Sequence, residues 1–299
     1  MSDDTKDPQN NDESRELPRR DFVAMSVAAA GLAAAGSALG AGVVETEVEI
    51  KTPDGTCDAA FIHPASGSHA GVLIWPDAFG LRPSMRDMAK RLAAQGYSVL
   101  VPNPFYRMGK APFFTDASTV DFAKDRGKIQ PLMTSVTTPG NAEKDAVAYI
   151  AFLDAQKQVN TKKKIGTQGY CMGGGLVMRT AATVPDRVGA GGSFHGGGLV
   201  STKPDDPNSL HLLAPKIKAK MYFGIAMSDD KQQPDAKDKL REAFIAANNP
   251  AEIEVYSTCF HGWCVPDMPK QADGTPTYDK AEADRAWAKL TALYKGALA

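Results

Sequence analysis

A cysteine between two glycines is the arrangement in this sequence best suited to nucleophilic chemistry. The run Gly169-Tyr170-Cys171-Met172-Gly173 separates a predicted strand from a predicted helix. A nucleophile in such a sharp turn has a strained backbone, and small neighbours keep Cβ atoms from colliding with the adjoining strand and helix. The helix N-terminus favours a thiolate, and the N–H of Met172 is placed where an oxyanion would develop. The pattern indicates a nucleophilic Cys171; the alternative is a glycine-rich turn that contains a buried, inert thiol.

Candidates for an acid and a base follow two later strands. Asp229 and Asp230 come after the predicted strand 219–225, and His261 comes after the predicted strand 252–256. The order nucleophile, acid, base, with each group at the end of a strand, is typical of the α/β-hydrolase fold. Both Asp229 and Asp230 are candidates for the acid that orients His261. The alternative base is His195, which also suits a place in a pocket lining or a core hydrogen bond.

The elements around these residues alternate between strands and helices. Further strands are predicted at 71–75, 97–102, 164–168 and 187–194, and helices at 84–95, 142–156, 172–183, 234–248 and 280–297. Segments 43–51 and 59–63 predict an N-terminal β-hairpin, whereas 103–140 lacks periodicity and predicts loops or a lid, with one short amphipathic piece at 120–128. The fold class expected is α/β: an α/β-hydrolase fold with a mainly parallel, doubly wound sheet and helices on both faces.

Composition narrows the possible partners. The chain has 299 residues, 43% of them hydrophobic, and a formal net charge of −1, which is compatible with one large domain. The absence of a broad basic field argues against nucleic acid as a partner. Four cysteines are too few for a disulfide scaffold, although Cys259 and Cys264 are close enough for a local pair. The five histidines show no zinc spacing, so we expect neither a metal nor another cofactor.

The first forty residues have the composition of an export signal. Arg19 and Arg20 precede an Ala- and Gly-rich apolar run that reaches about residue 40, which resembles a bacterial twin-arginine signal. The alternative is a transmembrane anchor, but the run falls short of about 20 apolar residues and glycine dilutes it. We expect cleavage after Gly40, a catalytic domain over residues 41–299, no stable membrane anchor after processing, and a periplasmic or secreted protein.

Several sequence blocks resemble the dienelactone hydrolase family over residues 44–297. These blocks are Pro76-Asp77-Ala78-Phe79-Gly80-Leu81, Gly169-Tyr170-Cys171-Met172-Gly173-Gly174, Asp230 four residues before Pro234, and His261-Gly262-Trp263. The resemblance implies a small-molecule ester or lactone as substrate and a triad of Cys171, Asp230 and His261. It also implies an oxyanion hole made by the N–H groups of Ala78 and Met172.

Trp263 is a candidate substrate-binding residue, because it suits the wall of an apolar pocket together with Trp75 and Phe79; the alternative is that these aromatic residues belong to the core. The resemblance implies further substrate-binding positions, and Arg107 matches an arginine that binds the substrate carboxylate. Asp77 stands where the family has a glutamate that holds the resting thiol, and Val265 stands where a second arginine is usual. Half of the carboxylate clamp is therefore missing. A broad carboxylesterase and a ligand-binding protein without turnover remain the alternative functions.

Overall fold

The computed structural model describes residues 37–38 and 42–299. The predicted export signal and its cleavage site after Gly40 lie outside the described residues, apart from Ser37 and Ala38. These two residues form a short strand, β1, at one edge of the sheet.

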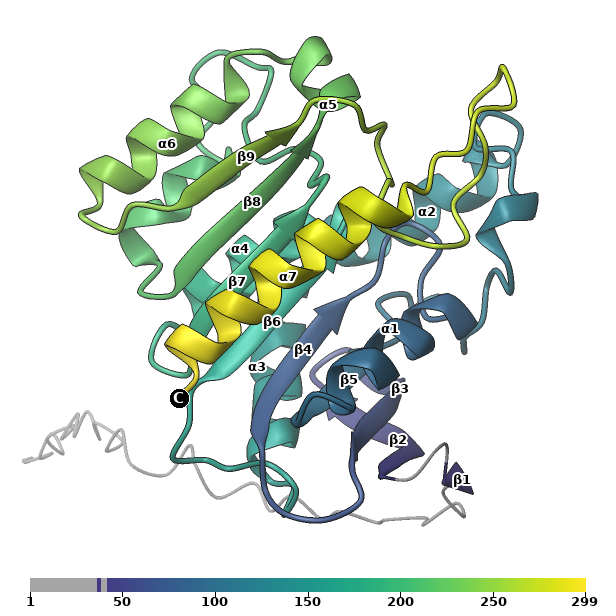
Figure 1. Cartoon of the computed structure of the whole chain (residues 1–299), viewed down its shortest axis with the longest axis vertical. Coiled ribbons are helices and arrows are strands. Elements are labelled where there is room, and N and C mark those ends of the chain that lie inside the picture. Colours follow the sequence, from purple (N-terminus) through teal and green to yellow (C-terminus); the bar gives the residue numbers. More distant parts are fainter. Residues whose placement is uncertain (1–36, 39–41) are drawn as a thin grey trace, which may run out of the picture. The chain divides into compact units, whose positions relative to one another are not determined.

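One nine-stranded sheet runs through the described part of the chain (Figure 1). Its strands lie in the order β1-β2-β3-β5-β4-β6-β7-β8-β9. The strands after β1 are β2 Val43–Thr52, β3 Gly55–Pro64, β4 Ala70–Trp75, β5 Tyr97–Pro102, β6 Ile165–Tyr170, β7 Val188–Phe194, β8 Lys220–Ala226 and β9 Glu252–Tyr256. The pairs from β1 to β5 are antiparallel, and every pair from β5 to β9 is parallel. The predicted hairpin and the mainly parallel sheet are both confirmed.

Alternating side chains of the central strands build two cores, one on each face of the sheet. On β4, Val72 and Ile74 pack with one cluster, whereas Leu73 and Trp75 pack with the other. This is the two-residue period of a strand that is covered on both faces. Helices α1 Pro83–Ala93 and α7 Lys280–Ala297 cover the first face, and α7 crosses in front of the strands in Figure 1. Helices α2 Arg126–Thr137, α3 Asn141–Asp154, α4 Met172–Thr183 and α6 Ala236–Ala246 pack on the other face.

The segment 103–140 is more regular than its sequence predicts. It contains a short 3₁₀ helix, η2 Ala117–Thr119, and the three-turn helix α2. Pro131 lies inside α2, and a proline there removes a helical hydrogen bond and argues against a helix at the sequence level. Packing overrides this local penalty, because α2 buries Ile129, Leu132 and Val136 against the core.

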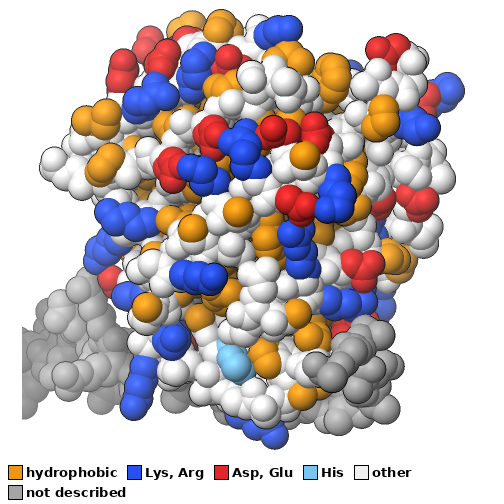
Figure 2. All heavy atoms as spheres, in the orientation of Figure 1, with side chains coloured by type: hydrophobic (Ala, Val, Ile, Leu, Met, Phe, Trp, Pro, Cys, Tyr) orange, Lys and Arg blue, Asp and Glu red, His pale blue; other side chains and the backbone are white. Residues whose placement is uncertain are grey.

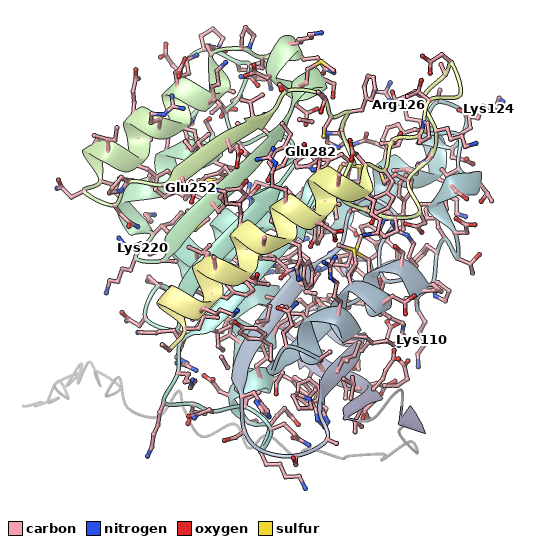
Figure 3. All side chains as sticks on the ribbon, in the orientation of Figure 1. Lys110, Lys124, Arg126, Lys220, Glu252 and Glu282 are labelled. Atoms are coloured by element: carbon pink, nitrogen blue, oxygen red, sulfur yellow. The ribbon has the colours of Figure 1, made fainter. Side chains whose placement is uncertain are left out.

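The surface carries charges of both signs. Lys110, Lys220 and Glu252 extend away from the ribbon in Figure 3, and acidic and basic side chains are interspersed on the face in Figure 2. No helix in the described part of the chain is long and apolar enough to cross a membrane.

Candidate active site

Cys171 lies in a strained turn between β6 and α4. Its backbone has φ 53° and ψ −117°, in the left-handed half of conformational space that few non-glycine residues occupy. A Cβ atom at Gly169 would lie 2.1 Å from the carbonyl oxygen of Gly173, and a Cβ atom at Gly173 would lie 2.4 Å from the carbonyl oxygen of Trp75. Both flanking glycines are therefore required by steric contact, for the reason predicted from the sequence.

His261 is held by Asp229, and this corrects the expectation for Asp230. His261 Nδ1 donates to both carboxylate oxygens of Asp229, at 2.9 and 3.0 Å, whereas Asp230 accepts from Lys237 Nζ at 2.6 Å. The two acids belong to a short helix, α5 Met227–Gln232, and not to the predicted loop. Consecutive side chains on a helix diverge by about 100°, so only one of them faces His261. The backbone N–H of His261 also donates to Ser228 Oγ at 2.9 Å.

The electrostatics of His261 connect it to the nucleophile. Burial alone lowers the pKa of His261, but the negative charge of Cys171 and hydrogen bonds with Asp229 and Cys171 outweigh it and hold the pKa well above its usual value. The charge effect requires the side chains of Cys171 and His261 to lie near each other. An imidazolium beside a thiolate is the charge arrangement of an activated cysteine.

The other three thiols lie in environments that keep them protonated. Burial raises the pKa of Cys57 to about 12 and that of Cys259 to about 11, and burial also raises the pKa of Cys264 well above its usual value. Cys259 and Cys264 are both free in this structure, so the possible local disulfide is not formed.

His195, the alternative base, lies on the buried side of the nucleophile. Its side chain is fully buried, and its Nδ1 accepts the backbone N–H of Cys171 at 3.0 Å. His195 therefore has the core hydrogen bond that the sequence left open.

The two predicted oxyanion donors lie on segments that touch. A Cβ atom at Gly173 would collide with the carbonyl oxygens of Trp75 and Pro76, so the segment after β4 lies directly against the elbow. Within residues 42–299, the N–H groups of Ala78 and Met172 donate to no other protein group.

Asp77 has a structural partner, which corrects its expected contact with the thiol or substrate. Asp77 Oδ1 accepts from Arg82 Nη1 at 2.7 Å and from the N–H of Phe79 at 2.9 Å, and Oδ2 accepts from Arg82 Nη2 at 2.9 Å. The guanidinium of Arg82 also donates to Asp267, at 2.7 and 2.8 Å. This ion cluster, in which Asp77 and Arg82 are buried and Asp267 is partly exposed, ties the segment after β4 to the loop that follows His261. The sequence did not predict this role for Arg82 or Asp267. Each is simply a charged residue a few positions after a conspicuous block, Pro76–Leu81 for Arg82 and His261–Trp263 for Asp267.

Arg107 is also engaged within the protein. It donates to the two carboxylate oxygens of the buried Asp145 at 2.8 Å each, and to Asp54 Oδ2 at 2.8 Å. These partners lie on α3 and in the β2–β3 turn. Its planar fork is occupied within the protein, where the sequence predicts a contact with a substrate carboxylate.

Trp263 is a core residue and does not line a substrate pocket. It is fully buried, and its ring lies 4.6 Å from that of Tyr256 and 5.3 Å from that of His195. The expectation that it binds substrate is corrected accordingly.

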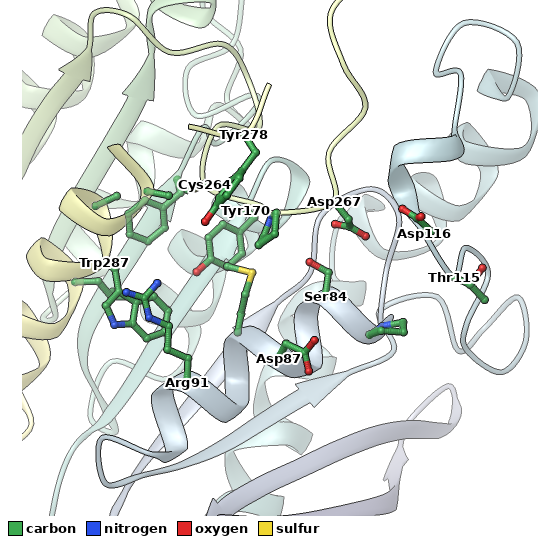
Figure 4. A pocket seen from close by; sticks show the side chains of 17 residues that line it. Ser84, Asp87, Arg91, Thr115, Asp116, Tyr170, Cys264, Asp267, Tyr278 and Trp287 are labelled. Carbon is green, nitrogen blue, oxygen red and sulfur yellow. The ribbon is translucent and has the colours of Figure 1, made fainter. Parts of the chain in front are cut away.

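A cavity of about 530 Å³ lies on the face of the sheet that α1 and α7 cover. It is bounded by these two helices and by the segment after His261. Figure 4 shows Trp287 of α7 and Asp116 of the 103–140 segment at opposite sides of it, with Tyr170 between them. Cys171, Asp229 and His261 are not among the residues that line this cavity. No group of three His, Cys, Asp or Glu side chains within the described ranges could hold a metal ion.

Comparison with known proteins agrees with the geometry. The model of the dienelactone hydrolase family matches residues 57–298. A Methylorubrum extorquens protein named "Putative carboxymethylenebutenolidase" is 28% identical over 257 residues, which cover 83% of this chain and 80% of that protein. The carboxymethylenebutenolidase of Rhodococcus opacus is 26% identical, with coverage of 71% and 78%.

Among solved structures, a dienelactone hydrolase-like promiscuous phosphotriesterase from metagenomic libraries matches with a TM-score of 0.69. It is 21% identical, and the match covers 86% of this chain and 100% of that one. This likeness bears on the fold alone, and with the sheet order it confirms the expected α/β-hydrolase fold.

Proposed function

The chain belongs to the dienelactone hydrolase family, a family of hydrolases that act on esters or lactones, and we propose that it cleaves such a bond with Cys171, His261 and Asp229. The observation that carries the triad is the strained placement of Cys171 beside His261, whose other ring nitrogen is held by Asp229.

The reaction proceeds through an acyl-enzyme. The Cys171 thiolate attacks the carbonyl carbon, and the N–H groups of Ala78 and Met172 stabilise the resulting oxyanion. The intermediate collapses as the C–O bond to the alcohol breaks, and His261 gives its proton to the leaving oxygen. His261 then takes a proton from water, the hydroxide adds to the thioester, and the acid leaves with restoration of the thiolate. Asp229 stabilises the imidazolium and fixes its orientation.

We propose a neutral ester as the preferred substrate. Arg107 is saturated by Asp54 and Asp145, and Val265, at the position of the second arginine, is fully buried. The guanidinium of Arg82 is paired with two carboxylates, those of Asp77 and Asp267. A substrate carboxylate would find no free guanidinium in any of these places, so the broad-esterase alternative gains support over an acidic lactone.

The role of Arg107 can be tested by Arg107→Met. We expect a loss of about 3 kcal/mol in the free energy of unfolding, because Asp145 is left buried without its paired cation. The ratio of kcat/KM for an acidic half-ester to that for a neutral ester of similar size should not change. Thermal or urea unfolding and steady-state kinetics measure these two effects.

Arg187→Met is the matched control, since Arg187 makes a bidentate pair with Asp154 at a more exposed site. Its expected loss is below about 1 kcal/mol. A selective loss of activity on the half-ester in Arg107→Met would show that Arg107 does bind substrate.

We further propose export by way of Arg19 and Arg20. Changing both to lysine should leave the precursor unprocessed in the cytoplasm, because the paired arginines before the apolar run are the targeting feature. Immunoblots of periplasmic and cytoplasmic fractions report the outcome. Arg15→Lys is the control and should be processed normally; equal periplasmic yields for all three proteins would contradict export through this signal.

A further inference from the structure

The turn after β7 contacts both backbone polar groups of the nucleophile. The N–H of Cys171 is shared between the carbonyl oxygen of Phe194, at 3.1 Å, and His195 Nδ1, at 3.0 Å. The N–H of Gly197 donates to the carbonyl oxygen of Cys171 at 3.2 Å. The turn is itself fixed to the next strand, because the N–H of His195 donates to the carbonyl oxygen of Gly224 at 2.8 Å. Residues 194–197 thus form a clasp around the Cys171 backbone.

The ring of His195 also supports the base. It lies edge-to-face against the ring of His261, with centroids 4.8 Å apart and planes at 66°. The side chain of His195 is fully buried, and Trp263 packs against it from another side. One residue therefore contacts both the nucleophile's main chain and the ring of the base.

Chemistry requires His195 to be neutral in this position. A ring nitrogen that accepts an N–H carries no proton, so the proton of the neutral ring sits on Nε2. Protonation would turn Nδ1 into a donor facing the N–H of Cys171. Burial, followed by the positive charge of His261, holds the pKa of His195 well below its usual value. The neutral form is also compatible with an imidazolium at His261.

We infer that His195 is a positioning residue, which fixes the separation of Cys171 and His261 by holding the backbone of one and the ring of the other. This inference rests on the proposed function. A left-handed non-glycine backbone is strained and persists only where its surroundings over-determine it. His195 has a positive φ of its own, 40°, so a strained residue stands on each side of the hydrogen bond between the two turns. A misplacement of about 1 Å between reacting groups can lower a rate by about 100-fold.

Three substitutions separate the two contacts of His195. His195→Asn keeps an acceptor near the position of Nδ1 but removes the ring, and His195→Phe keeps a ring but removes the acceptor. His195→Ala removes both. We expect kcat for a neutral aryl ester to fall about 10-fold in the Asn and Phe variants and about 100-fold in the Ala variant, with KM within about twofold of the parent value.

A residue that only stabilises the fold would lower the melting temperature of these variants without changing kcat in the temperature range where they remain folded. Kinetics are therefore measured well below each melting temperature. The control is His211→Ala, since His211 bonds Ser209 and contacts neither Cys171 nor His261; its kcat should stay within about twofold. An unchanged kcat in folded His195→Ala would overturn the inference.

A second readout does not depend on ester turnover. The rate at which iodoacetamide alkylates Cys171, followed by peptide mass mapping, should fall about 10-fold in His195→Phe and His195→Ala and less in His195→Asn, which keeps the acceptor for the Cys171 backbone. Equal alkylation rates in the parent and all three variants would contradict the clasp. If the parent shows no esterase activity, the proposed function fails, and this alkylation series still decides the role of His195.

Discussion

Replacing Cys171 with alanine should abolish ester hydrolysis and leave the fold intact. We expect kcat to fall by about 10⁴-fold or more, since no other group in the site can form the acyl-enzyme. Alanine has the same Cβ as cysteine, so the strained turn is unchanged and the melting temperature should stay close to that of the parent. Hydrolysis of a neutral aryl ester and thermal unfolding test these two expectations.

Cys57→Ala is the matched control for that experiment. Cys57 is fully buried on β3, where its thiol contacts Tyr149 Oη at 3.2 Å, and burial raises its pKa to about 12. Its loss should lower stability and leave kcat unchanged. Near-normal turnover in Cys171→Ala, or a loss of turnover confined to Cys57→Ala, would disprove the assignment of the nucleophile. An idle binding pocket, the alternative without turnover, would give no ester-derived adduct on Cys171 in the parent.

The second large effect is expected from Asp229→Asn. The carboxylate of Asp229 accepts from His261 Nδ1 with both oxygens, and an amide there can present a donor instead. A donor facing Nδ1 stabilises the tautomer in which the proton lies on the nitrogen that faces Cys171, so His261 can no longer act as a base. We expect kcat to fall by about 10³- to 10⁴-fold with little change in KM.

Asp230→Asn is the matched control, because it changes the neighbouring residue by the same atoms. Asp230 is paired with Lys237 on a partly exposed part of α5 and α6, so its loss should leave kcat within about twofold and stability within about 1 kcal/mol. Steady-state kinetics of the two variants give the ranking. A larger defect in Asp230→Asn would return the role of triad acid to that residue.

The order of the elements and the nature of the elbow follow from local patterns in the chain. Helices 172–183 and 280–297 and strand 252–256 are predicted with the bounds that the structure has. These features are decided by local physics: the period of apolar residues, and glycines that no side chain could replace beside Cys171. The position of His261 after the last strand follows from the order of residues along the chain once the fold class is known.

The pairing of charged groups depends instead on contacts between distant segments. Asp229, and not Asp230, accepts from His261 because both acids lie on a short helix, where consecutive side chains point in different directions. Arg107 and Asp77 were expected to contact substrate, but in the structure Arg107 is paired with Asp145 and Asp77 is paired with Arg82. His195 gained a place beside Cys171 because β6 and β7 are neighbours in the sheet. Hydrogen bonds and ion pairs act over about 3 Å, so they depend on contacts between distant segments that a local pattern does not specify.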